Sequence, residues 1–485
     1  VLYGHPDAQA ILTKIQVEND RLLILRNTVE GERPAGFVSY REIGNEDLFG
    51  VLKDMELANL VRGKSSREIL LITGIYARED GTGDSGVIRD APQQLLVEVL
   101  AKELEKNYSF ALFVAERGTA TKEVVYVLER QGFIRPHMAD ENDKRTIYMV
   151  DMHEPLMFLH NLDTTIKEPF ASNPAVLDAV EKNHKKLQIA MTKLYPGNLV
   201  LSLSSGIMYH RLVDRITALN DVPREPLVPR RLGKNMCVPF GKILRGKVVP
   251  NTVTKTLHTD KVYEPDLNSF TIEPFPYYSP LKSQIETIKS FDRPVILVDD
   301  LVHTANRLQV LVPQLREDGI PIKKVVVGVL SGYGRDLMQC LKVPVESIYS
   351  MPNLRQWFVE STLYPFIGGD TVRREEMKVA GLQPSINMIL PYATPRLSGC
   401  SREALVEFSA CCIENSRDLF QVLEAEYRKM YAKNLTLSRL SEAVILPLCP
   451  DKGSCMEYDE NLAASVYLEN DLETLWRMKE FLIKG

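Results

Sequence analysis

The sequence predicts a mixed α/β protein of several domains, built around a parallel sheet with helices on both faces. One observation is the apolar run Val295–Val298, which is typical of a strand buried on both faces of a parallel sheet. A second is the alternation of strand-like runs with segments of helical periodicity. A third is the length, because 485 residues usually make about three domains.

The N-terminal third of the chain predicts an alternating order of strands and helices. β-Branched and aromatic residues indicate the strands, and apolar residues at helical spacing indicate the helices. Strands are expected at 35–40, 69–77, 110–115 and 144–151, and helices at 92–106 and up to 133. Pro92 is the expected first helical position, because proline needs no amide partner there.

This order resembles the GNAT superfamily of acyl-CoA acyltransferases over roughly residues 15–151. Arg78, Gly81 and Gly83 match that family's Arg/Gln-x-x-Gly-x-Gly loop, whose backbone amides take the CoA diphosphate at a helix N-terminus. The resemblance implies that these three residues bind acetyl-CoA or another acyl-CoA. Leu128 stands where many family members place a tyrosine as general acid.

The second distinctive feature is a pair of acids, Asp299 and Asp300, expected where the buried strand ends. The turn Thr304–Arg307 follows and leads into a predicted helix that ends near Gly319. Ligands of open α/β sheets lie beyond the carboxyl ends of the strands, and a helix N-terminus attracts anions. Carboxylates there can hold hydroxyl groups or a Mg²⁺ ion. The sequence therefore predicts a sugar-phosphate site.

The stretch Val295–Arg307 resembles the phosphoribosyl diphosphate fingerprint of the type I phosphoribosyltransferases. The resemblance implies that Asp299 and Asp300 hold the ribose hydroxyls, with Mg²⁺ bound through hydroxyls or water. It also implies that the turn cradles the 5-phosphate through Thr304, Ala305, Asn306 and Arg307. The family's Thr-Gly-x-Thr turn is altered, since this chain has alanine in place of glycine and arginine in place of the last threonine.

Other segments resemble further parts of the same family. A predicted strand at 198–204 runs into a helix at 207–216, and the junction resembles the diphosphate loop through Ser204, Ser205 and Gly206. The segment 233–263 resembles the mobile loop that closes over the substrate. Its basic residues are Lys234, Lys242, Arg245, Lys247, Lys255 and Lys261, and Lys255 is assigned to substrate binding. Trp357, Phe358, Tyr364 and Phe366, which follow a strand at 323–331, are candidates for stacking on a base or for the core.

Pattern shifts suggest four regions. A GNAT-like domain covers 1–151, a helical connector 152–195, a phosphoribosyltransferase-like domain 196–370, and a mostly helical region 371–485. The expected helices outside the two domains lie at 173–194, 401–431 and 471–483. The last region contains no recognisable chemistry and is open to three roles: covering the active site, docking the first domain, or forming a homodimer surface.

Composition limits the function classes. Hydrophobic residues make up 45% and charged residues 25% of the chain, as in globular proteins, and a net charge of −5 gives no reason to expect nucleic acid. No apolar run approaches a membrane span, which favours a cytoplasmic protein, and the start at Val1 suggests a missing upstream segment. The seven cysteines are expected to be reduced, and among eight scattered histidines only His303 falls in the fingerprint.

The first function hypothesis is transfer of a 5-phosphoribosyl group from phosphoribosyl diphosphate to a nitrogenous base, with Mg²⁺ and little side-chain acid/base catalysis. A second is a regulatory protein that binds phosphoribosyl diphosphate or a nucleotide without turnover, which the altered Thr304–Arg307 turn favours. A third is acyl transfer from an acyl-CoA by the N-terminal domain. The sequence does not specify the acceptor.

Overall fold

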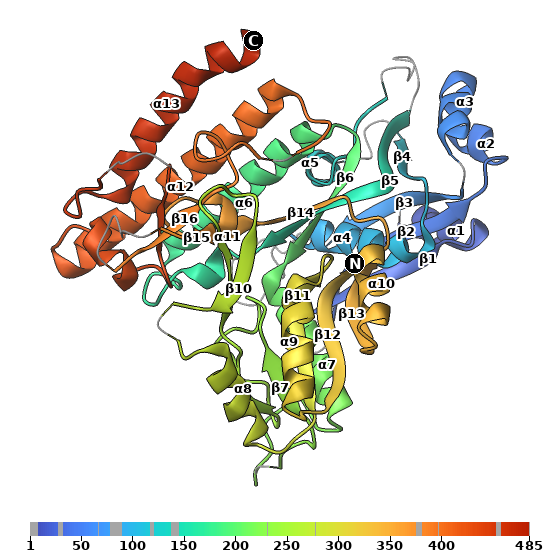
Figure 1. Ribbon diagram of the computed structural model, residues 1–485. Helices are drawn as coiled ribbons and strands as arrows, with labels where there is room; N and C mark the ends of the chain where they lie inside the picture. The colour runs from blue at the N-terminus through green and yellow to red at the C-terminus, as the bar shows by residue number, and fades with distance from the viewer. Residues whose placement is uncertain are drawn as a thin grey trace. The chain divides into compact units, whose positions relative to one another are not determined.

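The computed structural model describes residues 8–27, 33–65, 67–77, 90–116, 121–136, 145–229, 231–276, 278–374, 381–395, 397–452 and 457–484. The chain forms two compact units, each assembled from separate stretches of sequence (Figure 1). The first unit comprises Val1–Met157, Met191–Ser202 and Met351–Gln356, and the second comprises Phe158–Ala190, Leu203–Ser350 and Trp357–Gly485. No helix within the described ranges is long and apolar enough to cross a membrane.

The first unit is built on a sheet in the order β1-β2-β3-β4-β5, with β6 also paired to β5. Its strands are β1 (Arg21–Asn27), β2 (Arg33–Ile43), β3 (Ile69–Ala77) and β4 (Phe110–Glu116), together with the greater parts of β5 (Arg145–His160) and β6 (Asn198–Ser204), whose last residues, from Phe158 and from Leu203, belong to the second unit. Its helices are α1 (Ala8–Val17), α2 (Leu48–Leu52), α3 (Met55–Lys64), α4 (Ala91–Glu103) and α5 (Lys122–Arg130), and a 3₁₀ turn follows α4 at Leu104–Lys106. The expected strands and helices are confirmed as elements, although β5 continues to His160 and α4 begins at Ala91, one residue before Pro92.

Strands β3 and β4 pair in parallel over a short distance only. Leu70–Ile72 pairs with Ala111–Phe113, whereas β3 continues to Ala77 and β4 to Glu116. All the other strand pairs for which a register is given in this sheet are antiparallel. Within the described part of the unit, the facing edges of β3 and β4 are therefore unpaired over their last residues.

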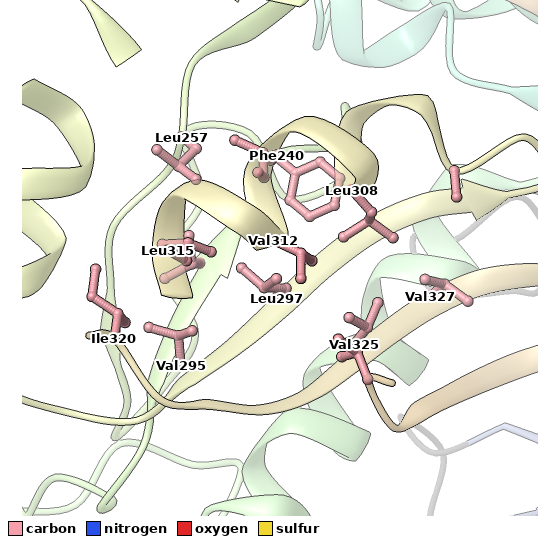
Figure 2. Close-up of a cluster of buried hydrophobic side chains, with 14 of the residues drawn as sticks. Phe240, Leu257, Val295, Leu297, Leu308, Val312, Leu315, Ile320, Val325 and Val327 are labelled. Atoms are coloured by element: carbon pink, nitrogen blue, oxygen red, sulfur yellow. The ribbon is translucent and has the colours of Figure 1, made fainter. Parts of the chain in front are cut away.

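The second unit contains a parallel sheet in the order β13-β12-β11-β7-β8, and the mixed α/β class is confirmed. Its strands are β7 (Met236–Pro239), β8 (Val253–Thr254), β11 (Val295–Val302), β12 (Ile322–Ser331) and β13 (Val345–Met351). Helix α9 (Asn306–Glu317) covers one face, where its apolar residues pack on Val295, Leu297, Val325 and Val327 (Figure 2). Helix α8 (Leu281–Lys289) contributes Ile285 and Ile288 to the same core. Helix α7 (Ser205–Leu219) packs on the other face, since a Cβ on Gly328 would collide with Met208.

A second sheet of this unit has the order β10-β9-β15-β16-β17. Its strands are β9 (Thr259–Tyr263), β10 (Phe270–Pro274), β15 (Asp370–Val372), β16 (Gln383–Ile386) and β17 (Leu448–Pro450). The segment 233–263, predicted as one mobile loop, thus contains β7, β8 and β9, and that prediction is wrong for these stretches. The C-terminal region is helical as predicted, with α12 (Arg402–Tyr431) packed along α13 (Ala464–Lys484), but it also contributes β16 and β17 to this sheet (Figure 1).

Candidate functional site

The acid pair lies inside β11, which continues to Val302, and not at the end of the strand as the sequence predicts. On one side, pairing with β12 continues as far as Val302. On the other side, pairing with β7 ends where Val298 meets Pro239. Asp299 and Asp300 are consequently the first residues of β11 without a partner strand on the β7 side. The chain that follows β7 reaches them there.

Asp300 is held by the turn that follows β7. The N–H of Lys242 donates to its Oδ2 at 2.6 Å, and the N–H of Ile243 donates to its Oδ1 at 3.0 Å. Hydrogen bonds from backbone amides to an ionised carboxylate are among the stronger ones in proteins. Each carboxylate oxygen has a second lone pair, so Asp300 can still accept a hydrogen bond from a ligand hydroxyl.

Gly241 permits this close approach. A Cβ at this position would lie 2.5 Å from Asp300 Oδ1 and 2.8 Å from Asp299 Oδ1. No side chain fits into that space without moving the turn or the acids. Gly241 could not be predicted from the sequence, because no sequence motif distinguishes a glycine that contacts two acids from the other glycines of this basic segment.

Asp299 is more deeply buried and differs electrostatically from its neighbour. Its Oδ1 accepts the N–H of Asp300 at 2.9 Å and lies 3.6 Å from Nη1 of Arg307. The pKa of Asp299 is raised to about 7: burial is the main cause, the Arg307 guanidinium opposes the shift, and the charge of Asp300 adds to it. Near neutral pH, Asp299 is therefore present in both its protonated and its ionised forms.

Three cations surround this pair of acids and form a basic cluster, Lys242, Arg245 and Arg307. Burial lowers the pKa of Lys242 and of Arg245, and repulsion among the three cations adds to both shifts. Arg245 lies over the ring of Phe275, at 5.4 Å from its centroid. Within the described ranges, the side chains of Lys242 and Arg245 have neither a hydrogen bond nor an ion pair. Partly buried donors of this kind are suited to an anion that carries several oxygens.

The neighbouring sheet supplies a second layer of charge. Burial raises the pKa of Asp370, on β15, while Lys261 and Lys242 oppose the shift. Asp260, on β9, accepts a hydrogen bond from Thr371 Oγ1 at 2.5 Å. Sequence analysis marked Lys261 only as part of a basic segment and missed both aspartates. The parallel pairing of β9 with β15 brings both aspartates to the site. The paired residues of these two strands are more than a hundred positions apart in the sequence.

The turn after β11 contains one residue in the left-handed backbone conformation. Ala305 has φ +49° and ψ 22°, a left-handed conformation that glycine adopts most easily. Asn306 Nδ2 donates to Thr304 Oγ1 at 2.9 Å. Helix α9 begins at Asn306 without a side-chain cap, so its first amides are available to an anion. Arg307 instead turns towards Asp299 and towards the carbonyl of Phe240, at 3.5 Å.

The other residues predicted for this site lie on separate elements. Ser204 caps α7, accepting the N–H of Ile207 at 3.4 Å, and Ser205 and Gly206 form the first turn of that helix. Lys255 follows β8 with an exposed side chain. Among the described residues, no hydrogen bond or ion pair joins these residues to the acid pair. The predicted CoA-loop residues Arg78, Gly81 and Gly83 lie outside the described residues.

The aromatic candidates divide into core and surface positions. Phe358, Tyr364 and Phe366 are buried, with at most 8% of the residue exposed, so they belong to the core. Trp357 is half-buried, and its ring centroid lies 5.0 Å from that of His303. Nδ1 of His303 is hydrogen-bonded to Ser331 Oγ at 2.8 Å, and burial lowers the pKa of this histidine. Trp357 is thus the member of the set that remains able to stack on a base.

Comparison with known proteins finds no matching family model and no matching curated protein. Among solved structures, a purine phosphoribosyltransferase from Pyrococcus horikoshii Ot3 is similar to 32% of this chain, covering 87% of its own length at 12% identity and a TM-score of 0.21. An N-acetyltransferase from Staphylococcus aureus Mu50 is similar to 30% of the chain, covering 76% of its own length at 11% identity and a TM-score of 0.19. An N-acyl amino acid synthase from uncultured soil microbes is similar to 30% of the chain, covering 92% of its own length at 16% identity and a TM-score of 0.20. Both transferase classes that the motifs resemble thus occur among these structures, at TM-scores too low to choose between them.

Proposed function

We propose that the second unit binds phosphoribosyl diphosphate and transfers its 5-phosphoribosyl group to a nitrogenous base or a related small acceptor. The observation that carries the proposal is the basic cluster beside the acid pair. Among the described residues, the side chains of Lys242 and Arg245 have no hydrogen bond or ion pair, and each carboxylate oxygen of Asp300 can accept a second hydrogen bond. An anionic sugar with several hydroxyls complements both features.

The ligand can be matched to the site group by group. The uncapped first turn of α9, with Ala305 in the left-handed conformation, suits the 5-phosphate. The basic cluster suits the diphosphate, and the second lone pairs of Asp300 suit the ribose hydroxyls. A Mg²⁺ ion held near the carboxylates of Asp299 and Asp300 would neutralise charge on the departing diphosphate.

The reaction itself is a displacement at the anomeric carbon. A ring or amine nitrogen of the acceptor forms the new bond to that carbon as the bond to diphosphate breaks, and the diphosphate takes the electron pair. The acceptor nitrogen loses its proton to solvent or to the diphosphate. Lys242 and Arg245 stabilise the negative charge that accumulates on the leaving group, since both already lie where burial strengthens such interactions.

A second candidate is binding without turnover, as in a regulatory protein. Two features of the acids favour it. Both carboxylate oxygens of Asp300 already accept backbone amide hydrogen bonds, and Asp299, with a pKa of about 7, is only partly ionised near neutral pH. An acid pair engaged in this way contributes less to holding a metal-bound diphosphate. Arginine in place of the family's last turn threonine points in the same direction.

A thermal-shift experiment separates these candidates. Phosphoribosyl diphosphate with Mg²⁺ should raise the melting temperature of the full chain, since a ligand at about a hundred times its Kd adds about 2.7 kcal/mol to stability. The double variant Asp299→Asn with Asp300→Asn should lose the shift, while Asp266→Asn, an exposed aspartate of the same unit, should keep it. Diphosphate release upon addition of free bases indicates transfer, and a shift without release indicates a regulatory protein. Absence of any shift in the unmodified chain contradicts both.

Acyl transfer by the first unit remains a separate candidate, favoured by the divergence of β3 and β4. Unpaired strand edges can hydrogen-bond to an extended ligand that carries amide groups, as the pantetheine arm of CoA does. Acetyl-CoA should then raise the melting temperature in the absence of phosphoribosyl diphosphate. If neither acetyl-CoA nor a long-chain acyl-CoA shifts it, this candidate is wrong.

A further inference from the structure

Two histidines and a glutamate from three separate elements converge inside the second unit. His160 ends β5, His184 lies in α6 (Pro174–Leu194), and Glu360 opens the short helix α11 (Glu360–Leu363). His184 Nδ1 is 2.5 Å from Glu360 Oε1, and His160 Nδ1 is 3.9 Å from Glu360 Oε2. One ligand atom from each of the three residues lies within 4.8 Å of the other two.

The surrounding contacts hold these side chains in position. The amide of Gln188 contacts His160 Nε2 at 2.7 Å, which leaves Nδ1 of that ring on the side of Glu360. Glu360 Oε2 accepts the N–H of Asn161 and of Leu162, both at 3.3 Å. The two imidazole rings lie edge to face, with centroids 4.5 Å apart. Hydrogen bonds that fix the outer ring nitrogen of a ligand histidine are a usual feature of protein metal sites.

The backbone on either side of the cluster is also fixed. Asn161 and Ser361 exchange two hydrogen bonds of 2.9 Å, one from Asn161 Nδ2 to Ser361 Oγ and one from Ser361 N–H to Asn161 Oδ1. These bonds join the residue after His160 to the residue after Glu360. The carboxylate and one imidazole are therefore parts of a single rigid connection.

We propose that His160, His184 and Glu360 bind one divalent transition-metal ion, Zn²⁺ being the best match. Two imidazoles and one carboxylate are a donor set found at zinc sites that keep a fourth position for water or substrate. Mg²⁺ and Ca²⁺ prefer oxygen ligands throughout, so a site with two nitrogen donors disfavours them. The proposal is independent of phosphoribosyl transfer, since it uses none of the residues of the β11 site.

Distances and accessibility agree with an ion at this position. Tetrahedral zinc with bonds near 2.1 Å separates its ligand atoms by about 3.4 Å. The observed separations are 2.5 Å from His184 Nδ1 to Glu360 Oε1 and 3.9 Å from His160 Nδ1 to Glu360 Oε2, and one ligand atom from each of the three residues lies within 4.8 Å of the others, so the side chains must shift to bind one ion. The side chain of Glu360 is fully buried, whereas 21% of the His184 side chain and 11% of the His160 side chain are exposed. An ion and its water can reach the cluster from the histidine side.

The main competing interpretation is a hydrogen-bonded pair between His184 and Glu360 without an ion. In that case a proton lies between the two side chains, and His160 is a neighbour of the pair rather than a ligand. The two interpretations differ in the expected binding of metal. A hydrogen-bonded pair alone does not bind Zn²⁺, whereas the proposed site binds one equivalent of Zn²⁺ per chain.

Metal titration of the full chain tests the proposal. Protein stripped with a chelator should bind one equivalent of Zn²⁺ by calorimetry and metal analysis, and its melting temperature should rise. His184→Gln and Glu360→Gln should weaken binding at least about tenfold, as the loss of one ligand requires. The control His153→Gln should bind normally, because His153 pairs with Asp151 at 2.8 Å without a second histidine. The proposal is overturned if both ligand variants bind Zn²⁺ as tightly as the unmodified chain, or if the unmodified chain does not bind Zn²⁺.

Cobalt spectroscopy provides a readout that does not depend on folded variants. Co²⁺ bound by two imidazoles and a carboxylate gives visible ligand-field bands without the charge-transfer absorption of a thiolate. No cysteine is among the three proposed ligands, so thiolate absorption would place the ion elsewhere and contradict the proposal. Bands without thiolate character that Zn²⁺ abolishes would support them.

Discussion

The second unit contains two sites with buried carboxylates, and different kinds of side chain lie next to the carboxylates at each site. Asp299 and Asp300 have backbone amides and the cationic side chains of the basic cluster as neighbours. Glu360 is surrounded by two imidazoles, which can be neutral and can offer a lone pair. Guanidinium and ammonium groups have no lone pair for a metal, but they match phosphate oxygens. The comparison indicates an anion site in the first environment and a cation site in the second.

The first prediction concerns the largest expected effect, the anchoring of the turn by Asp300. Asp300→Ala removes the acceptor of two amide hydrogen bonds, each worth about 1.5–3 kcal/mol when the acceptor is charged. We expect a loss of about 3–5 kcal/mol in the free energy of unfolding, measured by urea titration. The conservative variant Asp300→Asn should lose less, because its amide oxygen can still accept one bond. If Asp300→Ala lowers the free energy of unfolding by less than about 0.5 kcal/mol, water must accept the two amide hydrogen bonds in place of the carboxylate, and the turn is not anchored by Asp300.

The second prediction concerns the space that Gly241 leaves. Gly241→Ala places a methyl group 2.5 Å from Asp300 Oδ1, so the turn must move. We expect a loss of about 2–3 kcal/mol of stability together with weaker binding of phosphoribosyl diphosphate. Gly63→Ala is a matched control, since it lies in α3 and its added methyl would meet nothing within 4 Å. The control should gain up to about 1 kcal/mol. Equal effects at the two positions would contradict the close approach to the acids.

The third prediction uses the raised pKa of Asp299 and has the smallest expected effect. Burial raises the pKa of this carboxyl to about 7, above the value of about 3.9 in an unfolded chain. Its contribution to stability is therefore fully present below about pH 4 and is lost as the pH rises through about 7. Asp299→Asn should be as stable as the unmodified chain near pH 5 and more stable by about 1–2 kcal/mol near pH 8.5. Greater stability of the unmodified chain at the higher pH would show that Arg307 outweighs burial.

The local parts of both units could be predicted from the sequence. The apolar strand at Val295, the helix that ends near Gly319 and the helix expected at 401–431 each depend on neighbouring residues, and all three are present. The same holds for β3, whose bounds match the expected strand. Patterns of this kind express backbone preferences and burial within a few turns of the chain.

The non-local parts could not be predicted. Asp260 and Asp370 meet through a strand pairing, and His160, His184 and Glu360 meet through packing of three elements. No spacing rule connects such positions, since their separation in sequence is set by everything that folds between them. The acid pair was found because its residues are adjacent, whereas its partner Gly241 was missed because it is brought close only by the parallel pairing of β7 with β11.

The most direct test of the β11 site is calorimetric titration of phosphoribosyl diphosphate with Mg²⁺ into the full chain and into Arg245→Met. The account predicts one binding site in the unmodified chain and an affinity at least about tenfold lower in the variant, from the loss of one charge-assisted contact. Arg316→Met, an exposed arginine on α9, should bind normally. Equal affinities for all three proteins, or no heat of binding in the unmodified chain, would contradict the assignment of the basic cluster to a phosphorylated sugar.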